Sequence, residues 1–198
     1  MNKLIFATNN RHKVEEIRSI PGLNYEIISL KEAGIMIDIP EPYHTLEENA
    51  LQKSRTIYEL TGMDCFSEDT GLQVDALNGD PGVKSARYAG ENTSFEDNME
   101  KLLLNMQGLV NRNARFRTVL SLILNGNEYK FEGTCKGIII ADKRGEGGFG
   151  YDPIFLPEGA EKTFAQMDME EKNTYSHRKK AMDKLLLFLH DLHNQGSE

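Results

Sequence analysis

Cysteine and long apolar runs are both scarce in this sequence. The two cysteines, Cys65 and Cys135, lie far apart and form no CxxC or Cys/His pattern. The sequence therefore predicts neither a zinc site nor a disulfide framework, and it favours reduced thiols in the cytoplasm. No segment approaches the roughly 18 apolar residues of a membrane-spanning helix, and the N-terminal segment does not resemble a signal peptide. We therefore expect a cytoplasmic protein that makes no membrane contact.

Basic charge is also in short supply. The chain has 31 acidic and 23 basic residues, which gives a net charge of -8, and its longest basic block is the one around Arg178. This balance argues against binding along polymeric nucleic acid or to an anionic membrane, so any recognition of phosphate must be local. A chain of 198 residues with 39% hydrophobic content can bury a full core. Because domains usually span about 100–200 residues, we expect one domain covering residues 1–198.

Strand and helix patterns alternate along the chain. Strand patterns occupy residues 4–7, 25–30, 63–66 and 114–124 and resume from Glu128, whereas helix patterns begin at Val14 and cover residues 45–60, 94–106 and 176–193. Asn125, Gly126 and Asn127 predict a tight turn and therefore an antiparallel hairpin. A sheet with both helical crossovers and a hairpin must be mixed, so the sequence predicts an α/β fold with a mixed sheet.

Two predicted helices begin with cations, where a helix normally avoids them. The first follows Thr8, Asn9, Asn10, Arg11, His12 and Lys13. The second follows Ser176, expected to be its N-cap, with His177, Arg178, Lys179 and Lys180 in its first turn. A helix N-terminus presents unpaired N–H groups and a partial positive charge, so these positions favour an anion such as phosphate. The alternative is a solvated basic surface.

Glu68 and Asp69 end the predicted strand of residues 63–66 and precede Thr70 and Gly71. Adjacent strand residues face opposite sides, but a turn at the strand end would bring both carboxylates into one cavity. Oxygen ligands of this kind suit Mg2+, which takes one or two carboxylates together with phosphate oxygens and water. A solvated acidic turn is the alternative.

The glycine-rich loop of residues 145–150 is neither a Rossmann nor a P-loop motif, because its order GEGGFG lacks both patterns. Its aromatic residue, Phe149, is compatible with stacking on a planar base. The alternative, which the sequence favours, is a plain hairpin loop with Phe149 packed into the core. No GxSxG or comparable context indicates a Ser or Cys nucleophile.

Five separated segments together resemble the signature set of the inosine triphosphate pyrophosphatase family: TNNRHK, SEDTG, PGVKSARYAG, GGFGYDPIF and EEKNTYSHRKKA. The resemblance covers almost the whole chain. It implies an elongated mixed sheet with helices forming two lobes around a central cleft. It also implies a homodimer that hydrolyses noncanonical purine nucleoside triphosphates (ITP, dITP and XTP) to the monophosphate and pyrophosphate, with Mg2+.

The resemblance also implies roles for individual residues. Residues 8–13 resemble the triphosphate-binding loop, with Asn10 and Lys13 as direct contacts, and Lys53 resembles a further phosphate ligand. Asp69 matches the catalytic carboxylate, Glu41 a metal ligand, Glu68 a helper acting through water, and Thr70 a substrate contact. The residues that match the base-binding segment and the groups holding the base are Phe149, Gly150, Tyr151, Asp152, Lys172, His177 and Arg178.

The chain departs from many bacterial relatives in two motifs. It has Thr8-Asn9-Asn10 where they have TGN, and Glu68-Asp69-Thr70-Gly71 where they have DDSG. These changes keep the chemistry and put the ranking of substrates in doubt. Two other functions remain open: a Maf-type pyrophosphatase acting on pyrimidine nucleotides, against which the SHR and GGFGYD segments argue, and a noncatalytic nucleotide sensor, which would not need Asp69.

Overall fold

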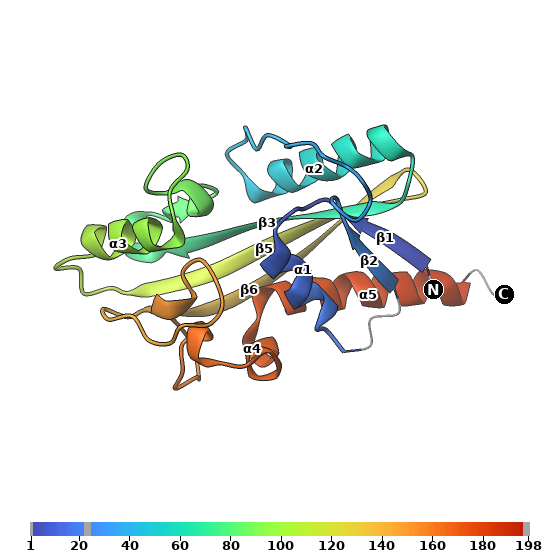
Figure 1. Ribbon diagram of the computed structural model, residues 1–198. Helices are drawn as coiled ribbons and strands as arrows, with labels where there is room; N and C mark the ends of the chain where they lie inside the picture. The colour runs from blue at the N-terminus through green and yellow to red at the C-terminus, as the bar shows by residue number, and fades with distance from the viewer. Residues whose placement is uncertain (1, 22–24, 196–198) are drawn as a thin grey trace. The chain divides into compact units, whose positions relative to one another are not determined.

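The protein has a mixed α/β fold, seen in a computed structural model that describes residues 2–21 and 25–195 (Figure 1). The helices are α1 (Arg11–Arg18), α2 (Leu46–Thr61), α3 (Phe95–Asn105), α4 (Met169–Tyr175) and α5 (His177–Gln195). The strands are β1 (Asn2–Phe6), β2 (Tyr25–Ser29), β3 (Cys65–Val74), β4 (Pro81–Gly82), β5 (Asn113–Leu124), β6 (Asn127–Ile139) and β7 (Phe155–Pro157). Short 3-10 turns cover Asp75–Leu77, Ser85–Arg87, Asp152–Ile154 and Phe164–Gln166.

The described strands form a seven-stranded sheet in the order β2-β1-β3-β5-β6-β7, with β4 paired to β3. Strand β1 runs parallel to β2 and β3, whereas β4 is antiparallel to β3 and β7 is antiparallel to β6. Only Asn125 and Gly126 separate β5 from β6, and both have positive φ, as a two-residue hairpin turn requires. The predicted mixed sheet and its hairpin are therefore confirmed.

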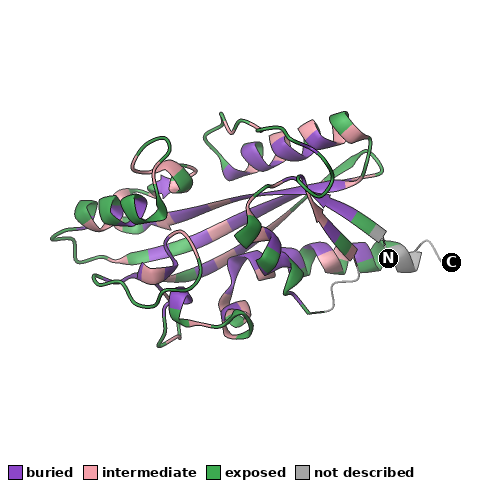
Figure 2. Cartoon of the chain, viewed as in Figure 1, coloured by how far each residue is buried: buried purple, intermediate pink, exposed green. Residues whose placement is uncertain are grey.

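The chain divides into two compact units, and each has its own apolar core (Figure 2). The first unit comprises residues 1–69, 118–133 and 177–198, and the second comprises residues 70–117 and 134–176. In the first unit, alternate strand residues face different helices: Leu4 and Phe6 pack with Ile17 and Leu185, while Ile5 packs with residues of α2 such as Ile57. In the second unit, residues of α3 and the strands share a core that includes Leu72, Met99, Leu102, Phe116, Phe155 and Phe164.

Local sequence signals account for the ends of two helices. The Thr45 side chain accepts a hydrogen bond from Glu48 N at the start of α2, and Gly62 ends that helix with φ of 66°. Ser94 and Asp97 form a capping box at the start of α3. The helix α4 was not predicted, and α5 continues to Gln195, beyond the predicted end. Within the described residues, no helix combines the length and apolar character needed to cross a membrane.

The predicted end of the third strand is wrong, because β3 continues through the polar residues to Val74. Ser67, Glu68 and Asp69 are almost fully buried, with 0%, 2% and 5% of their surface exposed. A polar run ends a strand when water must solvate it. Here the surrounding helices bind these residues instead: Ser67 donates to the main-chain oxygen of Ala50, Arg178 binds Glu68 and Lys53 pairs with Asp69, so the strand continues.

Gly133 allows β6 to lie against the first turn of α5. A Cβ atom at this position would overlap the main-chain oxygen of His177 and approach Ala181 N at 2.5 Å. We expect Gly133→Ala to lower the free energy of unfolding by about 1–3 kcal/mol, since backbone atoms in both elements would have to move. Urea denaturation measures this change.

The matched control for Gly133→Ala is Lys130→Ala, at an exposed position of the same strand. Its effect is expected to stay within about 0.5 kcal/mol. Equal unfolding midpoints for Gly133→Ala and the native protein would show that α5 does not depend on this close approach.

Candidate active site

Two buried carboxylates lie next to each other in the middle of β3. Successive side chains of a strand point to opposite faces, so Glu68 and Asp69 face different helices. The expectation that a turn brings both carboxylates into one cavity is therefore wrong, because the backbone stays extended through both residues. Each carboxylate instead has its own nearest cation within the first unit, Lys53 for Asp69 and Arg178 for Glu68, while the Lys13 charge acts on both.

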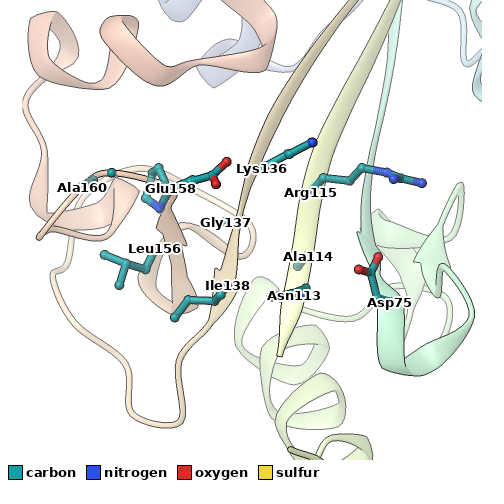
Figure 3. A pocket seen from close by; sticks show the side chains of 12 residues that line it. Asp75, Asn113, Ala114, Arg115, Lys136, Gly137, Ile138, Leu156, Glu158 and Ala160 are labelled. Carbon is teal, nitrogen blue, oxygen red and sulfur yellow. The ribbon is translucent and has the colours of Figure 1, made fainter. Parts of the chain in front are cut away.

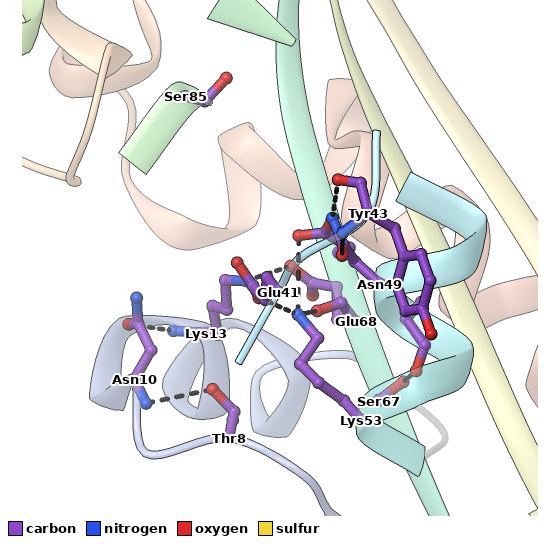
Figure 4. A network of polar contacts seen from close by, with 12 residues as sticks. Thr8, Asn10, Lys13, Glu41, Tyr43, Asn49, Lys53, Ser67, Glu68 and Ser85 are labelled. Atoms are coloured by element: carbon purple, nitrogen blue, oxygen red, sulfur yellow. Dashed lines mark hydrogen bonds and ion pairs between the residues drawn. The ribbon is translucent and has the colours of Figure 1, made fainter. Parts of the chain in front are cut away.

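The Asp69 group centres on Lys53 of α2. The Lys53 ammonium donates to the Glu41 carboxylate and to the main-chain oxygen of Glu68 at 2.6 Å, and its Nζ lies 3.5 Å from Asp69 Oδ1 (Figure 4). Lys53 is 6% exposed. Burial raises the pKa of the Asp69 carboxyl, the Lys53 ammonium opposes this, and the Glu41 charge adds to the rise. The ionised form of Asp69 therefore depends on a nearby cation.

Two residues that the sequence did not reveal support this group. The Asn49 amide accepts from Tyr43 N at 2.9 Å and donates to Tyr43 O at 3.2 Å, which ties the segment carrying Glu41 to α2. Ser67 donates to the main-chain oxygen of Ala50 and so ties β3 to the same helix. Asn49 lies one turn before Lys53, and a polar residue on the buried face of a helix is the signal that could have revealed it.

The Glu68 group centres on Arg178 of α5, which is 2% exposed. Its guanidinium binds Glu68 through two bonds, from Nε to Oε2 at 2.6 Å and from Nη2 to Oε1 at 2.7 Å, and it also binds Glu16. Lys13 Nζ lies 3.3 Å from Glu68 Oε1. Burial acts to lower the pKa of Arg178, but the two carboxylates outweigh it and raise that pKa.

Glu16 belongs to this group but was not predicted from the sequence. It lies on α1, three residues after Lys13, and it is 5% exposed. Residues three apart share a helix face, so its place beside Lys13 was detectable. The ion pair of Glu16 with Arg178 could not be predicted, because Arg178 lies 162 positions away along the chain.

The cationic start of α1 is confirmed as a structural feature. Asn10 is the N-cap and accepts from Lys13 N at 3.2 Å, while Asn10 N donates to Thr8 Oγ1 at 3.1 Å. The first turn of α1 has no acidic residue. Asn9, Arg11 and His12 are exposed, and Arg11 pairs with Glu15 at 2.7 Å. Contact of these residues with phosphate stays a prediction.

The helix start at α5 also lies where the sequence placed it. Ser176 has non-helical backbone angles, and α5 begins at the next residue, His177. Both residues are buried, as is Arg178. The alternative of a solvated basic surface is therefore wrong for His177 and Arg178, whereas Lys179 is partly exposed and Lys180 is exposed.

The predicted base-binding segment lies in the second unit, where Asp152 holds two of its parts together. Its Oδ2 accepts from Lys172 Nζ at 2.7 Å and from Phe149 N at 3.0 Å. Lys172 and Asp152 are 4% and 3% exposed. The Lys172 ammonium lies 5.4 Å from the centre of the Phe149 ring. The structure thus brings Phe149, Asp152 and Lys172 together.

The expectation that Phe149 packs into the core is wrong. Phe149 is partly exposed, whereas Tyr151 is 4% exposed and belongs to the core. The Tyr151 hydroxyl donates to Ser85 O at 2.8 Å, and burial raises its pKa. Between the two aromatic residues Gly150 adopts φ of 63°, which other residues rarely adopt. Thr70, also in the second unit, is partly buried on β3.

A pocket of about 480 Å³ lies elsewhere in the second unit (Figure 3). Residues of β5, β6 and β7 line most of it, including Arg115, Lys136, Ile138 and Leu156. Within the described part of the chain, no residue predicted for the nucleotide site lines this pocket. Its presence therefore does not bear on the predicted chemistry.

The fold and these charge groups place the chain among mixed α/β proteins built from two compact units. Its sequence matches the profile of the Ham1 family over residues 4–188. It is 50% identical over 184 residues to a dITP/XTP pyrophosphatase of Flavobacterium johnsoniae, covering 93% of this chain and 96% of that protein. It is also 50% identical over 190 residues to a dITP/XTP pyrophosphatase of Porphyromonas gingivalis, covering 96% and 98%.

Solved structures agree with this similarity. The Ham1 protein of Staphylococcus aureus superimposes with a TM-score of 0.86 at 40% identity, covering 96% of this chain and 99% of that one. The chain belongs to the Ham1 family. The resemblance read from its motifs is confirmed.

Proposed function

We propose that this protein hydrolyses the noncanonical purine nucleotides dITP, XTP and ITP to the nucleoside monophosphate and pyrophosphate. Two relatives that are 50% identical over nearly the whole chain are dITP/XTP pyrophosphatases, which supports the proposal. The single observation that carries it is the group formed by buried Asp69 and Lys53 with the partly exposed Glu41. Carboxylates beside a buried ammonium suit a reaction that moves negative charge between phosphate oxygens.

Magnesium fits the oxygen atoms of the Asp69 group. Glu41 and Asp69 both reach the same ammonium, and the main-chain oxygen of Glu68 joins them. Within the described residues, no cluster of three or more His, Cys, Asp or Glu side chains could hold a metal. Mg2+ does not need one, because it usually takes one or two carboxylates with phosphate oxygens and water. When bound, it would offset negative charge on the triphosphate.

We assign the chemical step to Asp69, which would orient or deprotonate the water that attacks the α-phosphorus. Lys13 and Lys53 would stabilise the leaving pyrophosphate, and the α1 start, with Asn10, would bind its oxygens. Glu68 would act only through water. Arg178 and Lys13 already bind its carboxylate, so Glu41 and Asp69 are the direct metal ligands in this proposal.

Base selection is assigned to Phe149, which would stack on the purine, and to Lys172, His177 and Arg178, which would hold its edge. Thr70, Gly150, Tyr151 and Asp152 stay predicted contacts. A guanidinium only donates hydrogen bonds, so Arg178 suits the 6-oxo group of hypoxanthine or xanthine and disfavours the 6-amino group of adenine. Leaving a buried donor unsatisfied costs about 1–3 kcal/mol. We further propose a cytoplasmic homodimer that acts on free nucleotides.

Product analysis tests this function. Purified protein is incubated with dITP, XTP or ITP and Mg2+, and the products are separated by chromatography. Monophosphate plus pyrophosphate is the expected result. Diphosphate plus orthophosphate would assign a different phosphohydrolase, and preference for pyrimidine nucleotides would assign the Maf type. Tight binding without product would favour a nucleotide sensor.

A further inference from the structure

We propose that Lys53 is the counter-ion of Glu41 and Asp69 in the nucleotide-free enzyme, and that Lys53 and a divalent cation compete for these carboxylates. This inference rests on the proposed function, because it takes the metal to bind there. It adds a role for Lys53 before the substrate arrives. Free Mg2+ would then bind weakly, and tight binding would require the nucleotide.

The first argument is that the ammonium of Lys53 has no donor to spare. An ammonium carries three N–H donors. Three oxygens surround Nζ: the Glu41 carboxylate and the Glu68 carbonyl by hydrogen bonds, and Asp69 Oδ1 as an ion pair. Lys53 must therefore release one of these oxygens before it can donate to a phosphate.

The second argument concerns electrostatic repulsion between Lys53 and a divalent cation at a site that is largely buried. The side chains of Lys53 and Asp69 are 8% and 7% exposed, whereas that of Glu41 is 26% exposed. Water screens charges weakly in such surroundings, so a divalent cation and an ammonium held by the same two carboxylates would repel each other strongly. The more exposed Glu41 gives the cation access. The flexible four-carbon stem of Lys53 lets its ammonium withdraw.

Together these contacts make binding of metal and nucleotide mutually dependent. Triphosphate oxygens offer the Lys53 ammonium new acceptors, so a nucleotide removes the competitor of the metal. The metal in turn compensates the carboxylates that Lys53 leaves. Each ligand therefore raises the affinity for the other by the same factor.

Calorimetric titration of Mg2+ into nucleotide-free protein tests the proposal. Lys53→Met removes the competing charge and keeps the apolar stem. We expect it to bind Mg2+ about tenfold more tightly than the native protein, or better. Lys162→Met is the control, because Lys162 pairs with Glu171 at 2.9 Å and both residues belong to the second unit, whereas the Asp69 group belongs to the first. Its affinity for Mg2+ is expected to stay within about threefold of the native value.

A second measurement guards against misfolding. The melting temperature of Lys53→Met should fall without metal and recover as Mg2+ is added, because Mg2+ replaces the lost counter-ion. If Lys53→Met does not fold, Lys53→Gln replaces it in both measurements. Equal or weaker Mg2+ affinity in the neutral variant, or no binding in any variant, would overturn the proposal.

These titrations contain no nucleotide. Their failure is therefore distinct from a failure to hydrolyse dITP or XTP.

Discussion

Replacing Asp69 by Asn is expected to lower turnover of dITP and XTP by about 10²–10⁴-fold, while the dissociation constant for the nucleotide without Mg2+ changes little. Asn keeps the shape of Asp69 but can neither take a proton from water nor carry the charge that Lys53 faces. Pyrophosphate release measures turnover, and equilibrium titration with a nonhydrolysable analogue measures binding. Asp64→Asn is the matched control, since Asp64 lies just before β3 and its carboxylate accepts from Asn125 N at 2.7 Å.

The pH profile of the native enzyme gives a second readout for Asp69. Burial raises the pKa of this carboxyl, so it keeps its proton up to a higher pH than an ordinary aspartate. Activity that needs the ionised form should therefore be complete above the raised pKa and fall as the pH drops through it. Asp69→Asn should lose this acid limb. Native-like turnover in Asp69→Asn would rule out the catalytic assignment.

Replacing Arg178 by Met is expected to lower the free energy of unfolding by about 3–5 kcal/mol at neutral pH. Met fills much of the same volume but leaves the buried carboxylates of Glu16 and Glu68 without their shared cation. Uncompensated buried carboxylates take up protons more readily than carboxylates in the unfolded chain. The deficit should therefore shrink as the pH is lowered towards the ordinary range of glutamate. Urea denaturation at several pH values measures both effects.

Arg55→Met is the control for this prediction. Arg55 also pairs with a glutamate, Glu128, but the two side chains are 51% and 38% exposed. An exposed pair contributes at most about 1 kcal/mol, so this variant should lose little stability. A loss of similar size in both variants would mean that burial of the Arg178 group is not what makes it important.

Features that depend on neighbouring residues could be predicted from the sequence. The starts of α2 and α3 follow from an N-cap residue and the residue three positions after it. The turn at Asn125 and Gly126 follows from residue types that tolerate positive φ. The length of β3 could not be predicted this way. Its polar residues remain in the strand because Lys53 lies 15 positions away and Arg178 lies 110 positions away.

The candidate site shows the same limit. Motifs identified Glu41, Lys53 and Asp69, and the structure brings these residues together. Motifs could not reveal that Glu68 belongs to a different group, because that depends on which helix covers each face of the sheet. The burial of Phe149 was predicted wrongly for a related reason: Tyr151, two residues later, packs into the core instead.

Glu68 belongs to both charge groups by different atoms: its carboxylate binds Arg178, and its carbonyl binds Lys53. Both contacts therefore depend on which face of the sheet each residue of β3 occupies. One residue inserted between Cys65 and Glu68 would send the aspartate towards α5 and the glutamate towards α2. The number of residues in this short piece of strand is thus as much a part of the active site as their identity.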